Sequence, residues 1–481
     1  MRLPQLWLSI LSVNSIFLLN LGFPLLTLPP TLHRGEVIAQ TDPNAEALRL
    51  LQQGLELFQQ GTAESYKQAI VALEKALQLY QQTRNLGGQA NSLLGLGRIY
   101  DLLGDKQQAL SFYNQSLPLL RQLGNKAAEA TTLNNIGNVY NALGDRQTAL
   151  DYLNQSLPLT RQVGDKAGEA RTLSNIGLVY YALGDRQTAL DFYNQSLPLR
   201  RQVGDKAGEA VTLNNIGNVY NALGDRQTAL DYLNQSLPLR RQVGDKAGEA
   251  RTLNNIGNVY NALGDRQTAL DYLNQSLPLT RQVGDKAGEA TTLSSIGGVY
   301  NALGDRQTAL DFYNQSLPLR RQVGDKAGEA VTLNNIGNVY NALGDRQTAL
   351  DFYNQSLPLR RQVGDKTGEA VTLNNIGQVY SALGDKQQAL EFYNQSLPLR
   401  RQVGDKTGEA NTLWNFAFLK RSQGNLTEAL TDIESAINII EELRTKIISQ
   451  DLRTSYFSTV YGYYQFYIDL LMELHQQNPN Q

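Results

Sequence analysis

Hydrophobic and small residues recur on one helical face of this chain, and the pattern repeats every 40 residues. In the stretch 144–183 this face carries four residues at i, i+3, i+4 and i+7, namely Leu173, Ile176, Gly177 and Tyr180. This spacing is typical of an amphipathic α-helix that buries one side. The glycine lets a neighbouring helix approach closely, and the larger residues fill the space beside it.

The same stretch contains a second helical pattern, formed by Ala149, Leu153 and Ser156. A Gly-Asp pair precedes each pattern, as in Gly164-Asp165. Glycine just past a helix end accepts the left-handed conformation, and aspartate caps the next helix by accepting its free N–H groups. Each unit is therefore predicted to hold two helices joined by tight turns. In this unit they are expected to run from about Arg146 to Val163 and from about Lys166 to Leu183.

The repeat extends through most of the 481 residues and is nearly exact, since residues 182–231 recur unchanged as residues 302–351. Repeats of this length form stacked arrays in which each unit contacts its neighbours. Such an array presents a long surface and little buried chemistry, so the pattern favours binding over catalysis.

The small and large positions resemble the tetratricopeptide repeat, and one unit matches through Leu133, Ile136, Gly137, Tyr140, Ala149, Leu153 and Ser156. The 40-residue period resembles the longer-helix subgroup seen in Partner-of-Inscuteable-type and kinesin-light-chain-type scaffolds. The resemblance implies an all-α, right-handed superhelical solenoid. We expect about ten helix pairs over residues 44–440, with irregular first and last units as caps, followed by a C-terminal capping helical segment over residues 441–481.

Proline recurs inside the second helix of the units, where the family pattern places it later. A proline within a helix removes one hydrogen bond and clashes with the carbonyl four residues before it. Two outcomes are open: a small kink in a continuous helix, or a helix that ends near Ser156 and restarts at Pro158, since proline is favourable in a first turn. The positions are Pro118, Pro158, Pro198, Pro238, Pro278, Pro318, Pro358 and Pro398.

The first 39 residues differ from the array. Arg2 precedes an apolar stretch over residues 6–28, and Val37 and Ala39 are small enough for a signal peptidase. This order is typical of a secretory signal, which we expect to be cleaved after Ala39. An uncleaved membrane anchor is the alternative, because about 20 apolar residues span a bilayer. Either outcome places the repeats outside the cytoplasm, periplasmic or extracellular, after a short linker at residues 40–43.

Composition removes several classes of function. The chain has 43 basic and 45 acidic residues and a net charge of −2, without the basic stripe that nucleic-acid binding needs. It has no cysteine and two histidines, His33 and His475. Zinc–thiolate sites and cysteine or histidine catalysis are thereby excluded, so we expect no enzyme activity, no metal and no cofactor.

Asparagines repeat on the first helix of each pair, at positions that line the concave groove in tetratricopeptide proteins. An amide offers donors and an acceptor, which suits the backbone of an extended peptide. Two alternatives remain: the amides bond to each other between repeats, or they are copied without a role. The candidate peptide-binding residues are Asn134, Asn138, Asn141, Asn214, Asn218, Asn221, Asn254, Asn258, Asn261, Asn334, Asn338 and Asn341.

Two arginines, Arg171 and Arg251, complete the candidate groove. Asn138 and Asn135 match asparagine positions of the family's carboxylate clamp, but its lysine position holds Asn134, so we do not expect a C-terminal carboxylate as the ligand. Two units interrupt the asparagine pattern, either as side-chain subsites or by drift. One carries Ser174, Leu178 and Tyr181, and the other carries Ser294, Ser295 and Gly298.

The C-terminal segment is rich in aromatic residues. Tyr456, Val460, Tyr464, Tyr467 and Leu471 lie at helical spacing and are expected to pack on the last repeat. Phe457, Tyr461 and Phe466 are left for partner docking or for ordinary capping. The last 45 residues or so resemble the junction of bacterial secreted tetratricopeptide proteins with a caspase-like CHAT domain, whose His–Cys pair this chain lacks.

The sequence thus predicts a non-enzymatic scaffold that binds proteins or extended peptides and contacts a membrane only through an uncleaved N-terminal segment. A regulatory arm for a CHAT-type protease and a self-assembling envelope spacer are the alternatives. The sequence does not indicate an oligomeric state.

Overall fold

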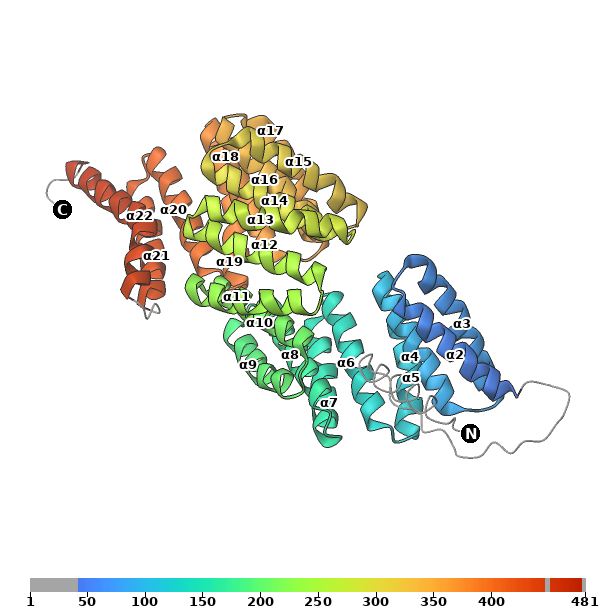
Figure 1. The fold of residues 1–481 in the computed structure, drawn as a ribbon. Coiled ribbons are helices and arrows are strands. Elements are labelled where there is room, and N and C mark those ends of the chain that lie inside the picture. The colour runs from blue at the N-terminus through green and yellow to red at the C-terminus, as the bar shows by residue number, and fades with distance from the viewer. Residues whose placement is uncertain (1–41, 446–449, 478–481) are drawn as a thin grey trace. The chain divides into compact units, whose positions relative to one another are not determined.

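The computed structural model describes residues 42–445 and 450–477, and within them every regular element is a helix (Figure 1). The helices are α2 (Pro43–Gln59), α3 (Ala63–Gln82), α4 (Leu86–Leu103), α5 (Lys106–Gln122), α6 (Lys126–Ala142), α7 (Arg146–Gln162), α8 (Lys166–Leu183), α9 (Arg186–Gln202), α10 (Lys206–Leu223), α11 (Arg226–Gln242), α12 (Lys246–Leu263), α13 (Arg266–Gln282), α14 (Lys286–Leu303), α15 (Arg306–Gln322), α16 (Lys326–Leu343), α17 (Arg346–Gln362), α18 (Lys366–Leu383), α19 (Lys386–Gln402), α20 (Lys406–Ser422), α21 (Leu426–Thr445) and α22 (Gln450–Gln477).

The helices pack as consecutive antiparallel pairs, from α2 with α3 to α20 with α21, and α22 follows the last pair. This confirms the all-α class and the repeated helix pairs. The described residues form two compact units that divide between Asp245 and Lys246. The first unit contains α2 to α11, and the second contains α12 to α22. The signal-peptide prediction for residues 1–39 lies outside the described residues.

Glycine and aspartate make the turns as the sequence predicts. Gly164 lies just after α7 and has a φ of 70°. This left-handed conformation is energetically unfavourable for residues that carry a side chain. The next residue, Asp165, caps α8 by accepting the Gly168 N–H at 2.9 Å. α7 ends at Gln162, one residue before the predicted end, and α8 has its predicted bounds.

The second helices continue through their prolines. α7 runs unbroken from Arg146 to Gln162 with Pro158 inside it, so the alternative of a helix that ends near Ser156 is wrong. Pro158 and Asn154, the residue whose carbonyl loses its partner, are both exposed. Water can therefore satisfy that carbonyl, which explains why the array tolerates one such proline in each regular unit.

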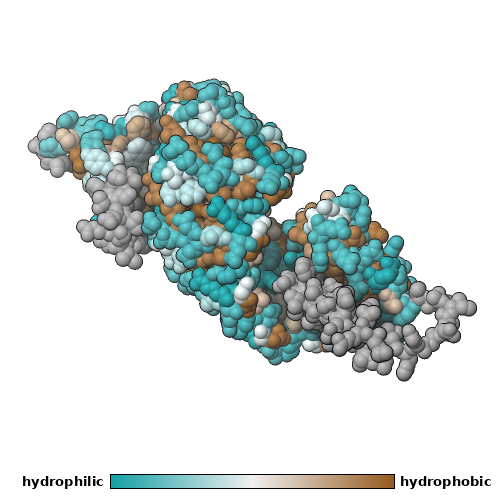
Figure 2. Space-filling model, viewed as in Figure 1, coloured by the Kyte–Doolittle hydropathy of each residue, from teal (hydrophilic) through white to brown (hydrophobic). Residues whose placement is uncertain are grey.

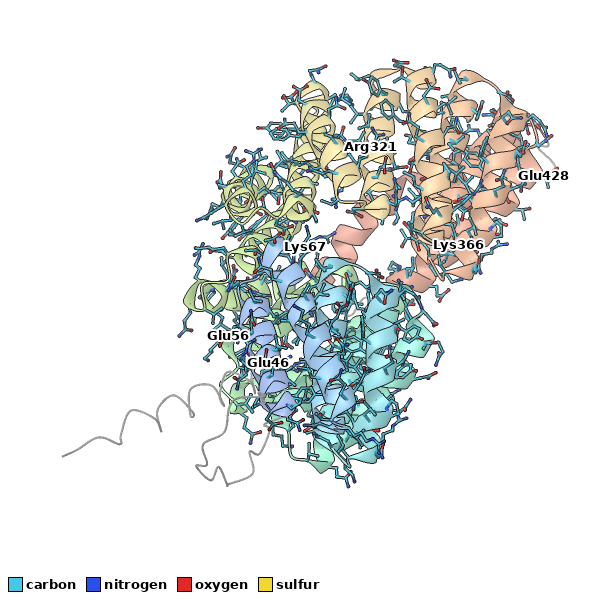
Figure 3. All side chains as sticks on the ribbon, turned by 90° about the vertical axis from the view of Figure 1, so that its right-hand side faces the viewer. Glu46, Glu56, Lys67, Arg321, Lys366 and Glu428 are labelled. Carbon is cyan, nitrogen blue, oxygen red and sulfur yellow. The ribbon has the colours of Figure 1, made fainter. Side chains whose placement is uncertain are left out.

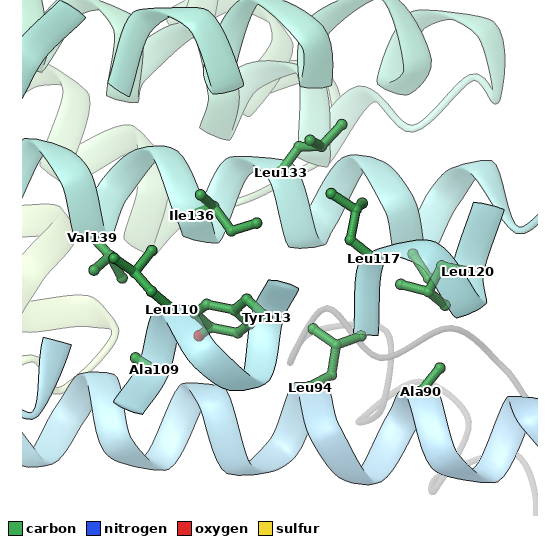
Figure 4. Close-up of a cluster of buried hydrophobic side chains, with 11 residues drawn as sticks. Ala90, Leu94, Ala109, Leu110, Tyr113, Leu117, Leu120, Leu133, Ile136 and Val139 are labelled. Atoms are coloured by element: carbon green, nitrogen blue, oxygen red, sulfur yellow. The ribbon is translucent and has the colours of Figure 1, made fainter. Parts of the chain in front are cut away.

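Each repeat has its core between the first and second helices. A Cβ placed on Gly137 would lie 2.7 Å from Leu153 Cγ and 3.0 Å from the Ala149 carbonyl oxygen, so only glycine permits this crossing. Figure 4 shows the equivalent core of α4, α5 and α6, in which the Tyr113 ring lies among aliphatic side chains. The sequence pattern of small and large residues is thus a pattern of close helix crossings.

Two further contacts recur in the pairs. Tyr140 of α6 stacks on Tyr152 of α7 with ring centroids 5.6 Å apart, and matching stacks follow in the next six pairs. The buried Ser156 hydroxyl donates to the Ala130 carbonyl at 2.8 Å. These contacts fix the second helix against the first helix of the same pair.

Ion pairs join consecutive repeats. Glu169 at the start of α8 accepts from Arg161 of α7 at 2.8 Å and from Lys166 at 3.0 Å. Arg321 and Lys366, labelled in Figure 3, belong to the equivalent pairs in later repeats. Hydrophilic residues predominate on the face of the repeats seen in Figure 2. In the described ranges we find no helix with the length and apolar character needed to cross a membrane.

Candidate functional site

The first helices of neighbouring pairs lie side by side within each unit. In the first unit α4 contacts α6, α6 contacts α8 and α8 contacts α10, whereas the second helices make no comparable contacts with one another. The first helices are therefore closer together and line the inner side of each unit. We call the side chains that they direct away from the second helices the inner face.

The inner face contains two kinds of asparagine. The first kind is buried: Asn134 is 3% exposed, and its Oδ1 accepts from Asn175 Nδ2 of the next repeat at 3.0 Å. The same bond joins Asn375 to Asn334 at 3.2 Å and Asn415 to Asn374 at 2.9 Å. These amides stabilise the stacking of repeats, as one of the two alternatives proposed.

Burial corrects the expectation that all twelve candidate asparagines line a binding surface. The four of the first kind are only 3–6% exposed, so they offer little surface to a ligand. They contribute to the spacing of the repeats, and we remove them from the candidate ligand contacts. They are Asn134, Asn214, Asn254 and Asn334.

The other eight asparagines are partly exposed, and we call them the asparagine face: Asn138, Asn141, Asn218, Asn221, Asn258, Asn261, Asn338 and Asn341. Asn338 uses its Oδ1 within the chain, accepting from Tyr353 Oη at 2.7 Å and from Asn375 Nδ2 at 3.0 Å. Within the described residues the side chains of Asn138, Asn141, Asn218 and Asn221 have no hydrogen-bond partner. These partly exposed amides offer donors and acceptors to a ligand.

Of the two helices that interrupt the pattern, α8 keeps the buried polar position and changes the exposed one. Ser174 stands where Asn134 stands in α6, and its hydroxyl pairs with Ser196 Oγ at 2.8 Å and Thr212 Oγ1 at 3.2 Å. Leu178 replaces the exposed asparagine and is 41% exposed. α8 therefore adds an apolar contact point to the inner face of the first unit.

The two candidate arginines lie in different surroundings. Arg251 on α12 is exposed, whereas Arg171 on α8 is partly buried on the inner face. Burial, and then repulsion from Arg200 and Arg98, lowers the pKa of the Arg171 guanidinium. The Nε of Arg98 is itself buried without a hydrogen-bond partner among the described residues. Arg98 and the buried Arg200 of α9 thus lie near enough to Arg171 to affect its pKa, which the sequence spacing alone did not reveal.

At the C-terminus the structure corrects the predicted packing of α22. Phe466, for which the sequence left partner docking and capping open, is 7% exposed and contacts Trp414 and Phe418 of α20, as capping requires. Leu471, expected to be packed, is 39% exposed, because α22 rests on both α20 and α21 and is rotated relative to the prediction. Tyr461 is 55% exposed, and the side chain of Phe457 lies outside the described residues.

The fold and the inner face define a class of protein: an all-α array of helix pairs with a polar inner surface. The sequence profile described as tetratricopeptide repeat matches residues 61–122, 128–202, 208–282, 248–322, 288–362 and 328–402. The chain belongs to the tetratricopeptide repeat family. No curated protein matches its sequence.

Several solved structures share the fold at low sequence identity. A Rap protein complexed with competence and sporulation factor is 15% identical with a TM-score of 0.57, over 75% of this chain and 99% of that one. The quorum sensor NprR from B. thuringiensis, in its apo form, is 18% identical with a TM-score of 0.53, over 65% and 87%. The Rap conjugation gene regulator of plasmid pLS20, in complex with the Phr* peptide, is 15% identical with a TM-score of 0.51, over 67% and 96%.

Proposed function

We propose that this protein is a non-enzymatic scaffold that binds an extended peptide, or an extended segment of a protein, along the asparagine face. The observation that supports this proposal is a set of side-chain amides on α6 and α10 that have no hydrogen-bond partner among the described residues, for example Asn138 and Asn218. An extended peptide has a free N–H and C=O at each residue, and a primary amide can donate to one and accept from the other. Each contact is weak, and repetition along the array adds the contributions.

The structural neighbours agree with this proposal. Two of them are described in complex with a peptide or factor, the Rap protein with competence and sporulation factor and the pLS20 regulator with the Phr* peptide. They share the arrangement of helix pairs with this chain and little sequence. Their ligands support peptide binding as one use of the fold. The ligand of this chain has to be identified by experiment.

The test compares two triple variants of a chain that begins at Gln40. The first removes three inner amides of the first unit, Asn138→Ala, Asn218→Ala and Asn221→Ala. The second is a matched control that removes three exposed asparagines from the second helices, Asn154→Ala, Asn194→Ala and Asn234→Ala. The parent and both variants are incubated with a random library of unstructured peptides, and the retained peptides are quantified by mass spectrometry.

The parent and the control are expected to retain the same peptides, and the inner variant to lose most of them while keeping its circular-dichroism melt. Equal retention by all three proteins would refute the asparagine face as the binding surface. No retention by the parent would move the proposal to a folded partner, docked elsewhere on the array.

We also propose, from the sequence of residues 1–39, that the repeats act outside the cytoplasm. Cell fractionation with mass spectrometry of the mature N-terminus tests this point. A mature chain that begins at Gln40 in the periplasm or medium is the expected result, and a full-length cytoplasmic chain would contradict it.

A further inference from the structure

Helix α22 lies where the first helix of a further pair would lie. It packs against α21, as α20 packs against α19 one repeat earlier (Figure 1). Tyr467 Oη of α22 donates to Glu434 Oε1 of α21 at 3.2 Å, and the Phe466 ring contacts Trp414 of α20. Within the described residues no second helix follows α22, so it lacks the partner that every other first helix has.

The side of α22 that is turned away from α20 and α21 is apolar. Ile468, Leu471 and Met472 lie at i, i+3 and i+4 and are 50%, 39% and 58% exposed. Tyr461, two turns before Ile468, extends the same side and is also exposed. Leu470 is fully buried, and helical geometry places it about 160° around the axis from both Ile468 and Met472. We call the exposed side, formed by Tyr461, Ile468, Leu471 and Met472, the α22 face.

In the regular pairs, the corresponding side of the first helix is covered by the second helix. On α8, Ile176 packs into the cluster of the preceding second helix, α7, and the next residue, Gly177, faces Tyr193 of its own second helix, α9. On α22 the same step of one residue leads from Tyr467, which is bonded to α21, to Ile468. The α22 face is therefore the place at which an antiparallel helix packs in each of the other pairs.

The chain itself offers one helix face that suits this place. Among the described residues, no helix other than α22 exposes more than two large hydrophobic side chains, because the other helices bury their apolar sides within the array. The α22 face of a second copy is apolar and exposed in the same way, and two identical faces cover each other about a two-fold axis.

The polar residues beside the α22 face permit such a pairing. Gln465, His475 and Gln476 are exposed and form no cluster of like charge. Asp469, the acidic residue beside the face, accepts from Gln465 at 2.8 Å. A second copy would therefore meet no strong electrostatic repulsion.

From this arrangement we propose that two copies of this protein pair through their α22 faces, antiparallel and with Ile468 near the two-fold axis. Ile468 lies midway between Tyr461 and His475, which are exposed near the two ends of the described face. Each α22 then takes the place of the second helix for the other copy. The contact involves one helix from each copy, less than a standard interface, so the dimer is weak and depends on concentration. It uses no residue of the asparagine face, and its test is independent of peptide binding.

The test measures association of the full chain by sedimentation equilibrium over a range of concentrations. Ile468→Glu and Ile468→Lys each bring two like charges together near the axis, which opposes pairing. Because Ile468 is half-exposed, both variants are expected to keep their fold, which circular dichroism checks. Leu343→Glu is the matched control, since Leu343 at the end of α16 is 53% exposed and lies outside α22.

The parent and Leu343→Glu are expected to form the same concentration-dependent dimer. Each Ile468 variant alone should raise the dimer dissociation constant by about tenfold or more. An equimolar mixture of Ile468→Glu and Ile468→Lys should regain the dimer, because opposite charges then meet near the axis. A parent that stays monomeric would overturn the pairing and leave the α22 face to a helix of a different protein. Equal association of all variants, or a mixture no better than its components, would overturn it as well.

A second measurement locates the contact directly. The chain has no cysteine, so one introduced thiol reports on one position. Ile468→Cys places two thiols near the axis, within reach of a disulfide between copies, and should give a covalent dimer with oxidised glutathione. Leu343→Cys should stay monomeric under the same conditions. Equal cross-linking of the two variants, or none in Ile468→Cys, would show that the copies do not meet at Ile468 and would overturn the proposal.

Discussion

The side-chain amide of Asn415 donates to the amide oxygen of Asn374, one repeat earlier, at 2.9 Å, and both side chains are buried. Thr412 Oγ1 approaches the same oxygen at 3.3 Å. Asparagine is a poor helix former, so its repeated use inside the first helices has a local cost. The bond between repeats offsets that cost and makes the contact of neighbouring first helices specific.

Asn374→Ala should therefore destabilise the second unit. The substitution leaves the buried Asn415 amide without its closest acceptor, which costs about 1–3 kcal/mol. Asn341→Ala, on the partly exposed asparagine face, should stay within about 0.5 kcal/mol of the parent. Urea unfolding, with hydrogen exchange of α18 and α20, distinguishes them. Equal protection of these helices in both variants would show that the amide bond contributes nothing to stacking.

Two adjacent glycines should respond to alanine with opposite signs. A Cβ on Gly297 would lie 2.9 Å from Tyr313 Cε1 and 3.1 Å from the Ala309 carbonyl oxygen. Overpacking of this kind costs about 1–3 kcal/mol. A Cβ on Gly298 meets nothing closer than Tyr313 Oη at 3.7 Å, so Gly298→Ala should gain about 0.5–1 kcal/mol of helix stability. Thermal unfolding of the two variants checks the signs, and shifts in the same direction would contradict the close crossing.

The sequence predicted where the helices begin and end, but it did not predict how deeply individual side chains are buried. Turn residues such as Gly164 and Asp165 act locally, so they indicate the helix ends without knowledge of the neighbours. Asn134 and Asn138 lie four residues apart on one helix face, yet the first is buried and the second partly exposed. The difference depends on how closely the next first helix approaches, which helical periodicity does not contain.

The same limit explains why the sequence left the role of Phe466 open. The spacing of aromatic residues in α22 identifies a packing face only if one neighbouring helix is assumed. In the structure α22 packs against two helices, α20 and α21, and Phe466 contacts Trp414 of α20 on the buried side.

Acid should weaken the contacts between repeats. Burial of the Glu209 carboxyl opposes its ionisation, but hydrogen bonds from Arg201 and Lys206 outweigh burial and hold its pKa below the ordinary value. The unfolded chain, with ordinary glutamate pKa values of about 4.3, then binds protons first as the pH falls. This stabilisation is complete above the ordinary pKa and is lost as the pH falls through the folded pKa.

The unfolding temperature should accordingly fall between about pH 5 and pH 3. The equivalent carboxyls Glu169, Glu289, Glu329 and Glu369 are lowered in the same way. A double variant, Glu209→Gln with Glu329→Gln, should melt lower at pH 7 and lose less on acidification. Scanning calorimetry at several pH values measures both. A double variant with the pH dependence of the parent would show that these ion pairs are too solvent-screened to matter.

Trp414 reports on the packing of α22, because a chain that begins at Gln40 contains no other tryptophan. Its ring centroid lies 6.2 Å from that of Phe466 and 6.0 Å from that of Tyr463. Phe466→Ala removes a buried aromatic side chain, a change that typically costs about 3–5 kcal/mol. The cost falls on α22, which is the last described helix, so α22 should separate from α20 while the repeats stay folded. We expect a red-shifted Trp414 emission and faster hydrogen exchange in α22 with an unchanged main melt, whereas Tyr461→Ala, at an exposed position, should change none of these. An unshifted emission in Phe466→Ala would mean that α22 is held by its contacts with α21 alone.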